Sequence, residues 1–310
     1  MTLRLALLCL VLALASLAIG PVDLVAIHAR DPELARTLFL ELRLPRTGLA
    51  LAIGAGLGGA GAATQALLRN PLASPDVLGP STGAALGAVL AGYFLGAGVI
   101  GMALGGVGGA LAALALLLAL AGSGAGSPQL ILAGVAVATL LGVAINLALS
   151  LAPSPFALYD LMTWLMGSLA DRTLPQLLLA APLIGLGLVL LIRSAPALDA
   201  LALGEEVAQS LGIATASLNR RTIMAVALAT GAGVAVAGSI GFIGLVVPHL
   251  VRPLTGHRPG AAILPAALAG AALLTAADIA VRLLPVDLKL GVLTALIGAP
   301  FFLWLILRGR

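Results

Sequence analysis

Residues 41–61 read ELRLPRTGLALAIGAGLGGAG, and this stretch decides the class of fold. Arg43, Pro45 and Arg46 stand before an apolar run in which small residues recur at every fourth position: Ala50, Gly54, Gly58 and Ala62. Glycine costs about 1 kcal/mol relative to alanine inside a helix in water. In lipid, small residues let helix backbones approach closely and gain dispersion contacts. The stretch therefore predicts a membrane helix packed tightly against others, starting at Pro45 because proline is tolerated in a first helical turn.

The composition of the whole chain agrees with a membrane protein. Hydrophobic residues make up 61% of the 310 residues, charged residues only 9%, and the mean hydropathy is +1.17. A bilayer crossing takes about 20 helical residues, so the chain has room for roughly ten spans. The apolar runs are continuous, which excludes the alternating strands of an outer-membrane barrel. We predict an all-α polytopic protein with a single transmembrane domain over residues 1–310. The expected spans lie near 3–20, 47–67, 78–95, 99–121, 129–150, 174–192, 222–238, 241–256, 261–281 and 290–307.

The first twenty residues have two interpretations. Arg4, the apolar run after it and the Ala-Leu-Ala at 13–15 are typical of a secretory signal. The same run is long enough for a first membrane span, and we expect it to be retained as one. The single cysteine, Cys9, lies in this run and cannot form an intramolecular disulfide.

The charges of the loops indicate the orientation of the chain. An even number of spans puts both ends on one side, and the basic residues Arg4, Arg308 and Arg310 place that side in the cytoplasm. Four arginines then fall in the one long outer connection: Arg30, Arg36, Arg43 and Arg46. One explanation is that they anchor the span at the lipid headgroups. The other is a docking surface for an acidic partner outside the membrane.

The spans contain very few groups that could carry out catalysis. Asp278 is the one carboxylate expected at membrane depth, toward the outer half of the ninth span. It is either a functional group of the membrane interior or the ion-pair partner of Arg282 at i+4. The three histidines, at 28, 249 and 257, have no metal-binding spacing, so no metal site is expected.

The chain also lacks the means to hydrolyse ATP through a P-loop. Its only lysine, Lys289, does not follow a glycine-rich loop. We therefore expect no enzymatic activity and no cofactor in this chain, and any energy from ATP must come from another subunit. The alternative is an ion-coupled secondary transporter, for which one peripheral aspartate is poor support. Transport by the isolated chain under an ion gradient would favour that alternative.

The longest cytoplasmic connection, about residues 194–221, carries the signature of a short helix. Glu205 and Glu206 suit a first helical turn, where the helix dipole favours anions. Val207 and Leu211 share a face at i, i+4, and Gly212 can supply a left-handed cap. The helix either lies on the headgroups or serves as a lever for a cytoplasmic partner.

These pieces, in this order, resemble the FecCD/BtuC family of permease subunits from type II ABC importers, which carry ferric siderophores, haem or cobalamin. The resemblance covers nearly the whole chain. Its blocks are RLPRTGLALAIGAGLGGAGAATQALLRNPLASPDVLGPSTGAALGAV (43–89), LYDLMTWLMGSL (158–169), LALGEEVAQSLG (201–212), GSIGFIGLVVPHLVR (238–252) and VLTALIGAPFFLWLIL (292–307).

The resemblance implies a fold, a location and partners. It implies a bundle of ten helices in the bacterial inner membrane, a second permease chain around a central pathway, two cytoplasmic ATPases that bind ATP and Mg²⁺, and a periplasmic binding protein. No nucleic acid is expected. Within block 43–89, NPLASPDVLG is more similar to siderophore permeases than to cobalamin ones, so the expected cargo is a ferric siderophore, then haem, then cobalamin.

The resemblance also assigns roles to residues. Arginines at the positions of Arg43, Arg46 and Arg282 receive acidic residues of the binding protein in the family. The region from Leu158 to Ser168 is implied in gating, with an apolar wall formed by Met162, Trp164 and Met166, although packing in the core is an alternative for each. The coupling segment that seats in the ATPase matches residues 203–212: Leu203, Gly204, Glu205, Glu206, Val207, Gln209, Leu211 and Gly212.

One segment departs from the family pattern. Relatives commonly read Glu-Leu-Pro-[Ile/Val]-Gly before the last span, and this chain has Asp287, Leu288, Lys289, Leu290 and Gly291. A cation replaces a proline there. The change leaves the local geometry open and could add to the docking charge.

Overall fold

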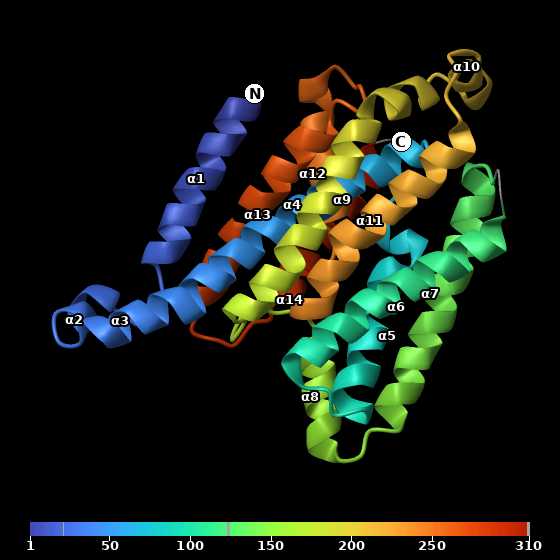
Figure 1. Ribbon diagram of the computed structural model, residues 1–310. Helices are drawn as coiled ribbons and strands as arrows, with labels where there is room; N and C mark the ends of the chain where they lie inside the picture. The colour runs from blue at the N-terminus through green and yellow to red at the C-terminus, as the bar shows by residue number, and fades with distance from the viewer. Residues whose placement is uncertain (21, 123–124, 309–310) are drawn as a thin grey trace.

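The computed structural model describes residues 1–20, 22–122 and 125–308, and the tail residue Arg310 used in the orientation argument lies outside them. The described chain is helical, with no strand among these residues. The α-helices are α1 (Thr2–Ala18), α2 (Leu24–His28), α3 (Pro32–Leu38), α4 (Leu44–Leu67), α5 (Pro80–Val89), α6 (Gly98–Ala121), α7 (Ser127–Ser150), α8 (Pro155–Leu165), α9 (Leu174–Leu201), α10 (Glu205–Ser210), α11 (Thr215–Ala237), α12 (Ile243–Val251), α13 (Ile263–Leu283) and α14 (Leu290–Arg308). Figure 1 shows them as one bundle.

The all-α membrane fold is confirmed. Each of the ten expected spans coincides with a helix, and six of those helices are long and apolar enough to cross a bilayer by themselves. Helices α1, α12 with the 3-10 turn η4 (Arg252–Thr255), and α14 are shorter apolar helices. The remaining expected span, 78–95, is α5 extended by the π-helical turn η3 (Leu90–Phe94).

Two boundaries of the expected spans were wrong, both next to the inner connection. Helix α9 continues to Leu201 in spite of Pro182 and Pro196, and α11 begins at Thr215 instead of 222. A proline removes one backbone hydrogen bond, but membrane helices tolerate it because neighbouring groups satisfy the freed carbonyls. The connection expected over 194–221 is therefore reduced to residues 202–214.

Pro45 lies in the first turn of α4, as expected, but the helical path does not begin there. The helical path is continuous over residues 32–67, and Pro45 lies inside it, just after the π-helical turn η1 (Phe39–Arg43). Proline has no N–H and its ring crowds the carbonyl four residues earlier. In the π turn, the Leu44 N–H donates to the Phe39 carbonyl, five residues back. We attribute the π turn to Pro45, because the wider turn gives the ring room without breaking the helix.

The predicted role of the glycine stripes in helix packing is confirmed. A Cβ on Gly58 would lie 2.1 Å from the carbonyl oxygen of Ala266 on α13, and one on Gly54 would lie 2.4 Å from that of Gly270. A second contact of this kind joins α5 and α6, where a Cβ on Gly87 would lie 2.1 Å from the carbonyl oxygen of Gly105. Only glycine permits these backbone approaches, so α4 can lie at the centre of the bundle against α13, α9, α11 and α12.

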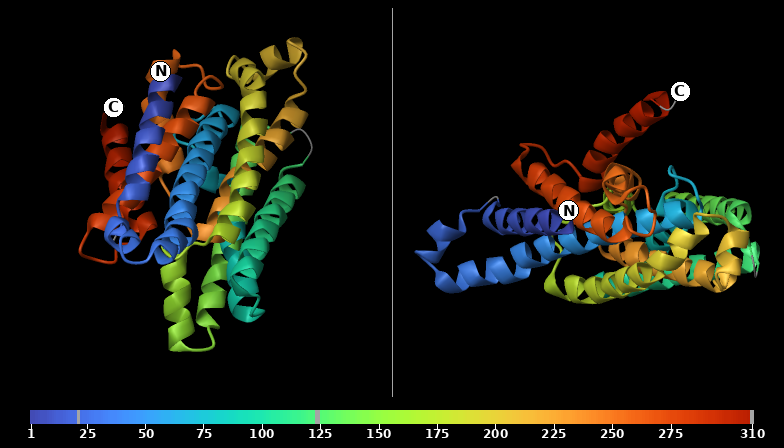
Figure 2. Two further views of the ribbon diagram at one scale, coloured as in Figure 1. Left: turned by 60° about the vertical axis from the view of Figure 1, so that its left-hand side comes forward. Right: turned by 90° about the horizontal axis from the view of Figure 1, so that it is seen from above.

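The bundle has two distinct ends. The left view of Figure 2 shows the start of α1, the far end of α14 and α10 at one end, and α2, α3 and α8 at the other. We call these the α10 end and the arginine end, the latter because it holds Arg43, Arg46 and Arg282. In the right view, α14 extends away from the other helices.

Candidate functional site

Two arginines from different helices converge on the last turn of α1. Arg43 Nη1 donates to the carbonyls of Leu17 (2.9 Å) and Ala18 (2.8 Å), and its Nη2 donates to the carbonyl of Val22. Arg282 Nη1 donates to the carbonyls of Ser16 and Ile19, both at 2.9 Å. The last carbonyls of a helix have no partner within it and carry the negative end of its dipole. Arg43 and Arg282 therefore cap α1 and hold it in the bundle.

Helix α1 makes polar contacts with the rest of the bundle. It packs along α13, where the Cys9 thiol donates to the carbonyl of Leu268 at 3.1 Å. Ser16 is fully buried and its hydroxyl lies 2.7 Å from that of Thr47 on α4. The first helix thus contributes buried polar contacts to the fold.

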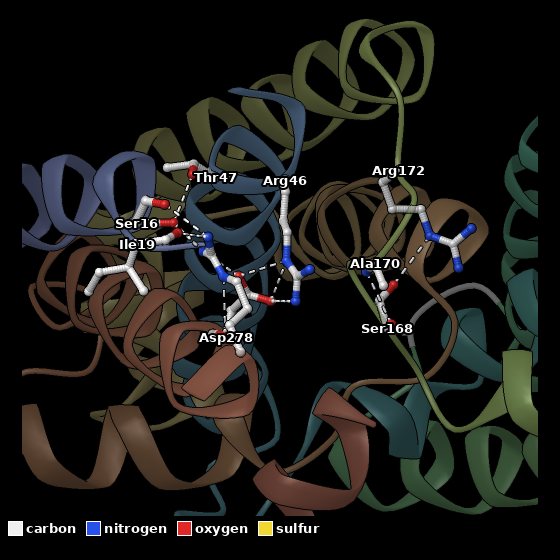
Figure 3. Close-up of polar contacts among 9 residues, drawn as sticks. Ser16, Ile19, Arg46, Thr47, Ser168, Ala170, Arg172 and Asp278 are labelled. Carbon is white, nitrogen blue, oxygen red and sulfur yellow. Dashed lines mark hydrogen bonds and ion pairs between the residues drawn. The ribbon is translucent and has the colours of Figure 1, made fainter. Parts of the chain in front are cut away.

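The centre of the arginine end is a buried carboxylate between two guanidinium groups. Asp278 on α13 is fully buried. Arg46 contacts it with two nitrogens: Nε lies 3.0 Å from Oδ1, and Nη2 lies 2.9 Å from the same oxygen. Arg282 Nη2 lies 2.7 Å from Oδ2 and also donates to the Ser16 hydroxyl. Figure 3 shows Arg46 facing Asp278, with Ser16 and Thr47 beside them.

The ion pair expected between Asp278 and Arg282 at i+4 is confirmed. The pairing with Arg46, 232 residues away in sequence, was not predicted. A buried carboxylate needs charged partners, and removing one typically costs about 3–5 kcal/mol because a charge is left uncompensated. The cluster therefore ties α1, α4 and α13 together at one end of the bundle.

The three arginines expected to dock a partner differ in their exposure and in whether any nitrogen remains free to bind that partner. The Arg282 side chain is only 4% exposed and each of its nitrogens donates to a backbone or side-chain acceptor. Arg43 uses Nη1 on the end of α1 and Nη2 on the Val22 carbonyl in the segment after it. The Arg46 side chain is 21% exposed, and its Nη1 makes no hydrogen bond within the described residues. Of the three, Arg46 offers the most to an outside partner.

Arg46 lines a small hollow at the arginine end. The hollow measures about 160 Å³ and has an apolar side, formed by residues such as Leu24, Leu38 and Leu42. The three arginines line it together with Asp171, which is exposed and has a left-handed backbone φ of 58°. The Asp171 carboxylate makes no hydrogen bond within the described residues. Three cations and one free carboxylate therefore meet at one surface depression.

Two other cations of this end make local contacts. Arg172 Nε donates to the carbonyl of Ser168 at 3.2 Å (Figure 3), and burial lowers the pKa of its guanidinium, an effect opposed by the nearby Asp171. Lys289, which replaces the usual proline, pairs with Asp287 at 2.8 Å. Its charge is balanced within the same loop, and the next residue, Leu290, is buried at the start of α14.

The α10 end carries the predicted short helix. It spans Glu205–Ser210 with both glutamates in its first turn, and Gly212 has the expected left-handed φ of 81°. Ala208 is buried beneath it, while Leu203 is 69%, Val207 41% and Leu211 62% exposed. Large apolar side chains with this exposure at a protein's end are typical of a contact surface.

The end of α9, next to α10, is braced against the loop before α13. Asp199, near the end of α9, accepts a hydrogen bond from the backbone N–H of Gly260 at 2.7 Å and pairs with Arg258 at 2.9 Å. A Cβ on Gly260 would lie 2.0 Å from the carbonyl oxygen of Ala195, so the loop lies directly on α9. Helix α9 therefore contacts both α10 and the 256–262 loop.

The candidate gate residues lie at the arginine end, on and just after α8. Met162 is 47% and Met166 44% exposed. Trp164 is half-buried against the cluster of Val89, Ala148 and Leu161, which agrees with the packing alternative for that residue. The two methionines are available to an apolar wall.

No group of histidine, cysteine, aspartate or glutamate among the described residues could hold a metal ion. The site consists of a cationic cluster at one end of the bundle and, at the other, a short helix with the exposed apolar side chains Leu203, Val207 and Leu211 on and beside it. Sequence reasoning missed Ser16, Thr47 and Asp199. Single hydroxyls in apolar runs and one loop aspartate give no pattern that would have identified them.

A bundle of apolar helices long enough to cross a bilayer, with a cationic hollow at one end and exposed apolar side chains around a short helix at the other, has the general arrangement of a polytopic membrane protein. Comparison with known proteins specifies the family: the model of the FecCD transport family matches residues 3–308, and the chain belongs to this family. The family comprises membrane permease subunits of ABC importers.

Individual relatives agree over most of their length. The chain is 39% identical to the cobalamin import system permease protein BtuC of Halobacterium salinarum over 289 residues, which is 90% of this chain and 75% of the relative. It is 41% identical to the hemin transport system permease protein HmuU of Yersinia pestis, over 88% of this chain and 84% of the relative. A solved structure described as an inward-facing conformation of a metal-chelate type ABC transporter matches with a TM-score of 0.90 and 31% identity, over 99% of this chain and 98% of the other.

Proposed function

We propose that this chain carries an intact metal chelate across the cytoplasmic membrane, driven by separate ATPase subunits and supplied by an external binding protein. The observation that carries the proposal is the separation of two surfaces in a chain of this family: the cationic hollow around Arg46 at one end and the exposed apolar face of α10 at the other. In this orientation the α10 end and both chain ends are cytoplasmic. The chain forms no covalent bond and needs no cofactor of its own.

Cargo is proposed from the relatives and the nature of the spans. The relatives named above are permeases for cobalamin and hemin, so a metal tetrapyrrole is the first cargo to test. The ferric siderophore expected from residues 70–79 is tested after these two. A large polar chelate must pass without being trapped, which suits a path with few fixed charges. Met162 and Met166 are proposed as part of its apolar wall.

A second permease chain is proposed to complete the pathway. Helix α7 is the least buried of the long spans, with Leu132, Leu140 and Val143 each more than half exposed. Leu296 and Leu303 give α14 a similar face. Lipid alone could cover these faces, and a partner chain would cover them on both sides of a central path.

One experiment tests both the subunit composition of the assembly and the identity of its cargo. The chain is co-expressed with its neighbouring ATPase subunit, and the purified assembly is weighed by native mass spectrometry after incubation with cobalamin, haem or a ferric siderophore. We expect two permease chains with two ATPase chains, and uptake of one of the three chelates by reconstituted vesicles. A monomer that recruits no ATPase would contradict the proposal.

Arg46 is proposed as the main docking cation. Arg46→Gln is expected to weaken association with the binding protein about tenfold and to make the remaining affinity less sensitive to salt, because a charge pair is lost. Biolayer interferometry on the assembly in nanodiscs over a range of salt concentrations measures both effects.

The matched control is Arg36→Gln. Arg36 is an exposed cation of the same connection and lies on α3, outside the Asp278 cluster. We expect it to change affinity by less than threefold, roughly the scale of a rim charge. If both variants behave like the unchanged protein, the arginines of this end serve only to hold α1 and to anchor the span.

A further inference from the structure

The cationic cluster at the arginine end contains a negatively charged group, the carboxylate of Asp278. A surface built to attract acidic groups gains nothing from a buried anion, yet Asp278 lies at its centre and is fully buried. An ion pair that only stabilised the fold would need one cation, and Arg282 already supplies it at 2.7 Å. The second, two-nitrogen contact with Arg46 asks for a separate explanation.

The explanation lies in the geometry of the guanidinium group. An arginine has five N–H donors in a planar fork, and one edge of the fork can pair with a carboxylate while the other stays free. In Arg46 the edge formed by Nε and Nη2 is held by Asp278, and Nη1 makes no hydrogen bond within the described residues. The held edge fixes the plane of the fork and leaves Nη1 available at the hollow.

Neighbouring contacts fix the position of Asp278 in turn. Arg282 holds Oδ2 of the carboxylate and is itself held by the carbonyls of Ser16 and Ile19. The Ser16 hydroxyl, which also accepts from Arg282, lies 2.7 Å from that of Thr47 on the same helix as Arg46. These contacts close a ring through α1, α4 and α13, so Arg46 has little freedom to move before a partner arrives. Preorganised donors bind better than mobile ones because less entropy is lost.

We propose that Asp278 is a positioning residue for docking: it orients Arg46 so that the free edge of the guanidinium meets an incoming carboxylate of the binding protein. This inference rests on the proposed function and adds to it how the orientation of the docking cation, Arg46, is fixed. Asp278 touches no partner itself.

A comparison of two aspartates separates positioning from simple charge. Asp278→Asn and Asp171→Asn each remove one negative charge beside the same hollow, but only Asp278 contacts Arg46. Asparagine tolerates a left-handed backbone such as that of residue 171. If the electrostatic field alone governed docking, both variants would bind an acidic partner more tightly. If Asp278 positions Arg46, Asp278→Asn weakens association about tenfold or more while Asp171→Asn leaves it unchanged or tighter.

The measurement is the affinity of the permease–ATPase assembly in nanodiscs for the binding protein, over a range of salt concentrations. Weakening by Asp278→Asn alone supports the inference. Equal or tighter binding by both variants overturns it. Should Arg46→Gln leave the affinity unchanged, the docking role in the proposed function fails first, and the role of Asp278 fails with it.

A second variant keeps the test independent of how well Asp278→Asn assembles. Arg46→Lys preserves the charge but has no planar fork, so it cannot hold Asp278 with one edge and present another. Positioning predicts that Arg46→Lys loses nearly as much affinity as Arg46→Gln. Retention of the original affinity by Arg46→Lys would show that charge alone suffices and would overturn the inference.

Discussion

Gly58→Val is expected to abolish the folded bundle. A Cβ at this position would lie 2.1 Å from the Ala266 carbonyl oxygen and 3.3 Å from the Gly270 Cα, both backbone atoms of α13. No side-chain rotation relieves a clash with backbone, so α4 and α13 must separate. Overpacking typically costs about 1–3 kcal/mol and occasionally more, and we expect a loss at or above that upper value. The yield of monodisperse protein in size-exclusion chromatography and its thermal unfolding in detergent measure the effect.

The matched control is Gly185→Val, at a glycine within α9. A Cβ there meets nothing within 4 Å, so the substitution tests the cost of valine in a membrane helix without the clash. We expect its unfolding temperature to stay close to that of the unchanged protein. A Gly58→Val protein that is equally well folded would show that α4 and α13 do not pack as closely as described.

The second large effect is expected at the α10 end of the bundle. Val207→Asp combined with Leu211→Asp should reduce binding of the ATPase subunit more than about tenfold, because exposed apolar side chains at the centre of an interface carry much of its binding energy. Both positions lie in or next to a short helix whose only buried residue is Ala208, so the fold should survive. Co-purification of the two subunits and the ATPase rate of the reconstituted assembly give the measurement.

Val25→Asp is the control for this pair. Val25 is 81% exposed on α2, at the arginine end, and its replacement introduces the same polar group far from α10. We expect ATPase binding to be unchanged in this variant. Equal loss in both proteins would point to general damage to the membrane domain, and no loss in either would remove α10 from the coupling role.

The sequence was sufficient for those features that depend on local pattern. Apolar length predicted spans that each coincide with a helix, the four-residue spacing of Ala50, Gly54 and Gly58 indicated close packing, and the i+4 spacing of Asp278 and Arg282 predicted their ion pair. The short α10 and the left-handed Gly212 followed from dipole and capping preferences.

Features that depend on distant parts of the chain could not be predicted. The carbonyls at the end of α1 are satisfied by Arg43 and Arg282, and the latter lies 266 residues from Ser16. No spacing rule connects these positions. The expectation that Arg43, Arg46 and Arg282 act alike came from the family resemblance and the outward charge, and the structure separates them, because two of them cap a helix while Arg46 retains a free edge.

The most direct test of the central claim, that this chain is a passive path driven by other subunits, is uptake of a labelled metal chelate into proteoliposomes. Cobalamin and haem are supplied with the binding protein, and the vesicles contain the permease with or without its ATPase, with or without a proton or sodium gradient. The account predicts uptake only when the ATPase, ATP and the binding protein are all present, whatever the gradient. Uptake by the permease alone, driven by an ion gradient, would contradict it.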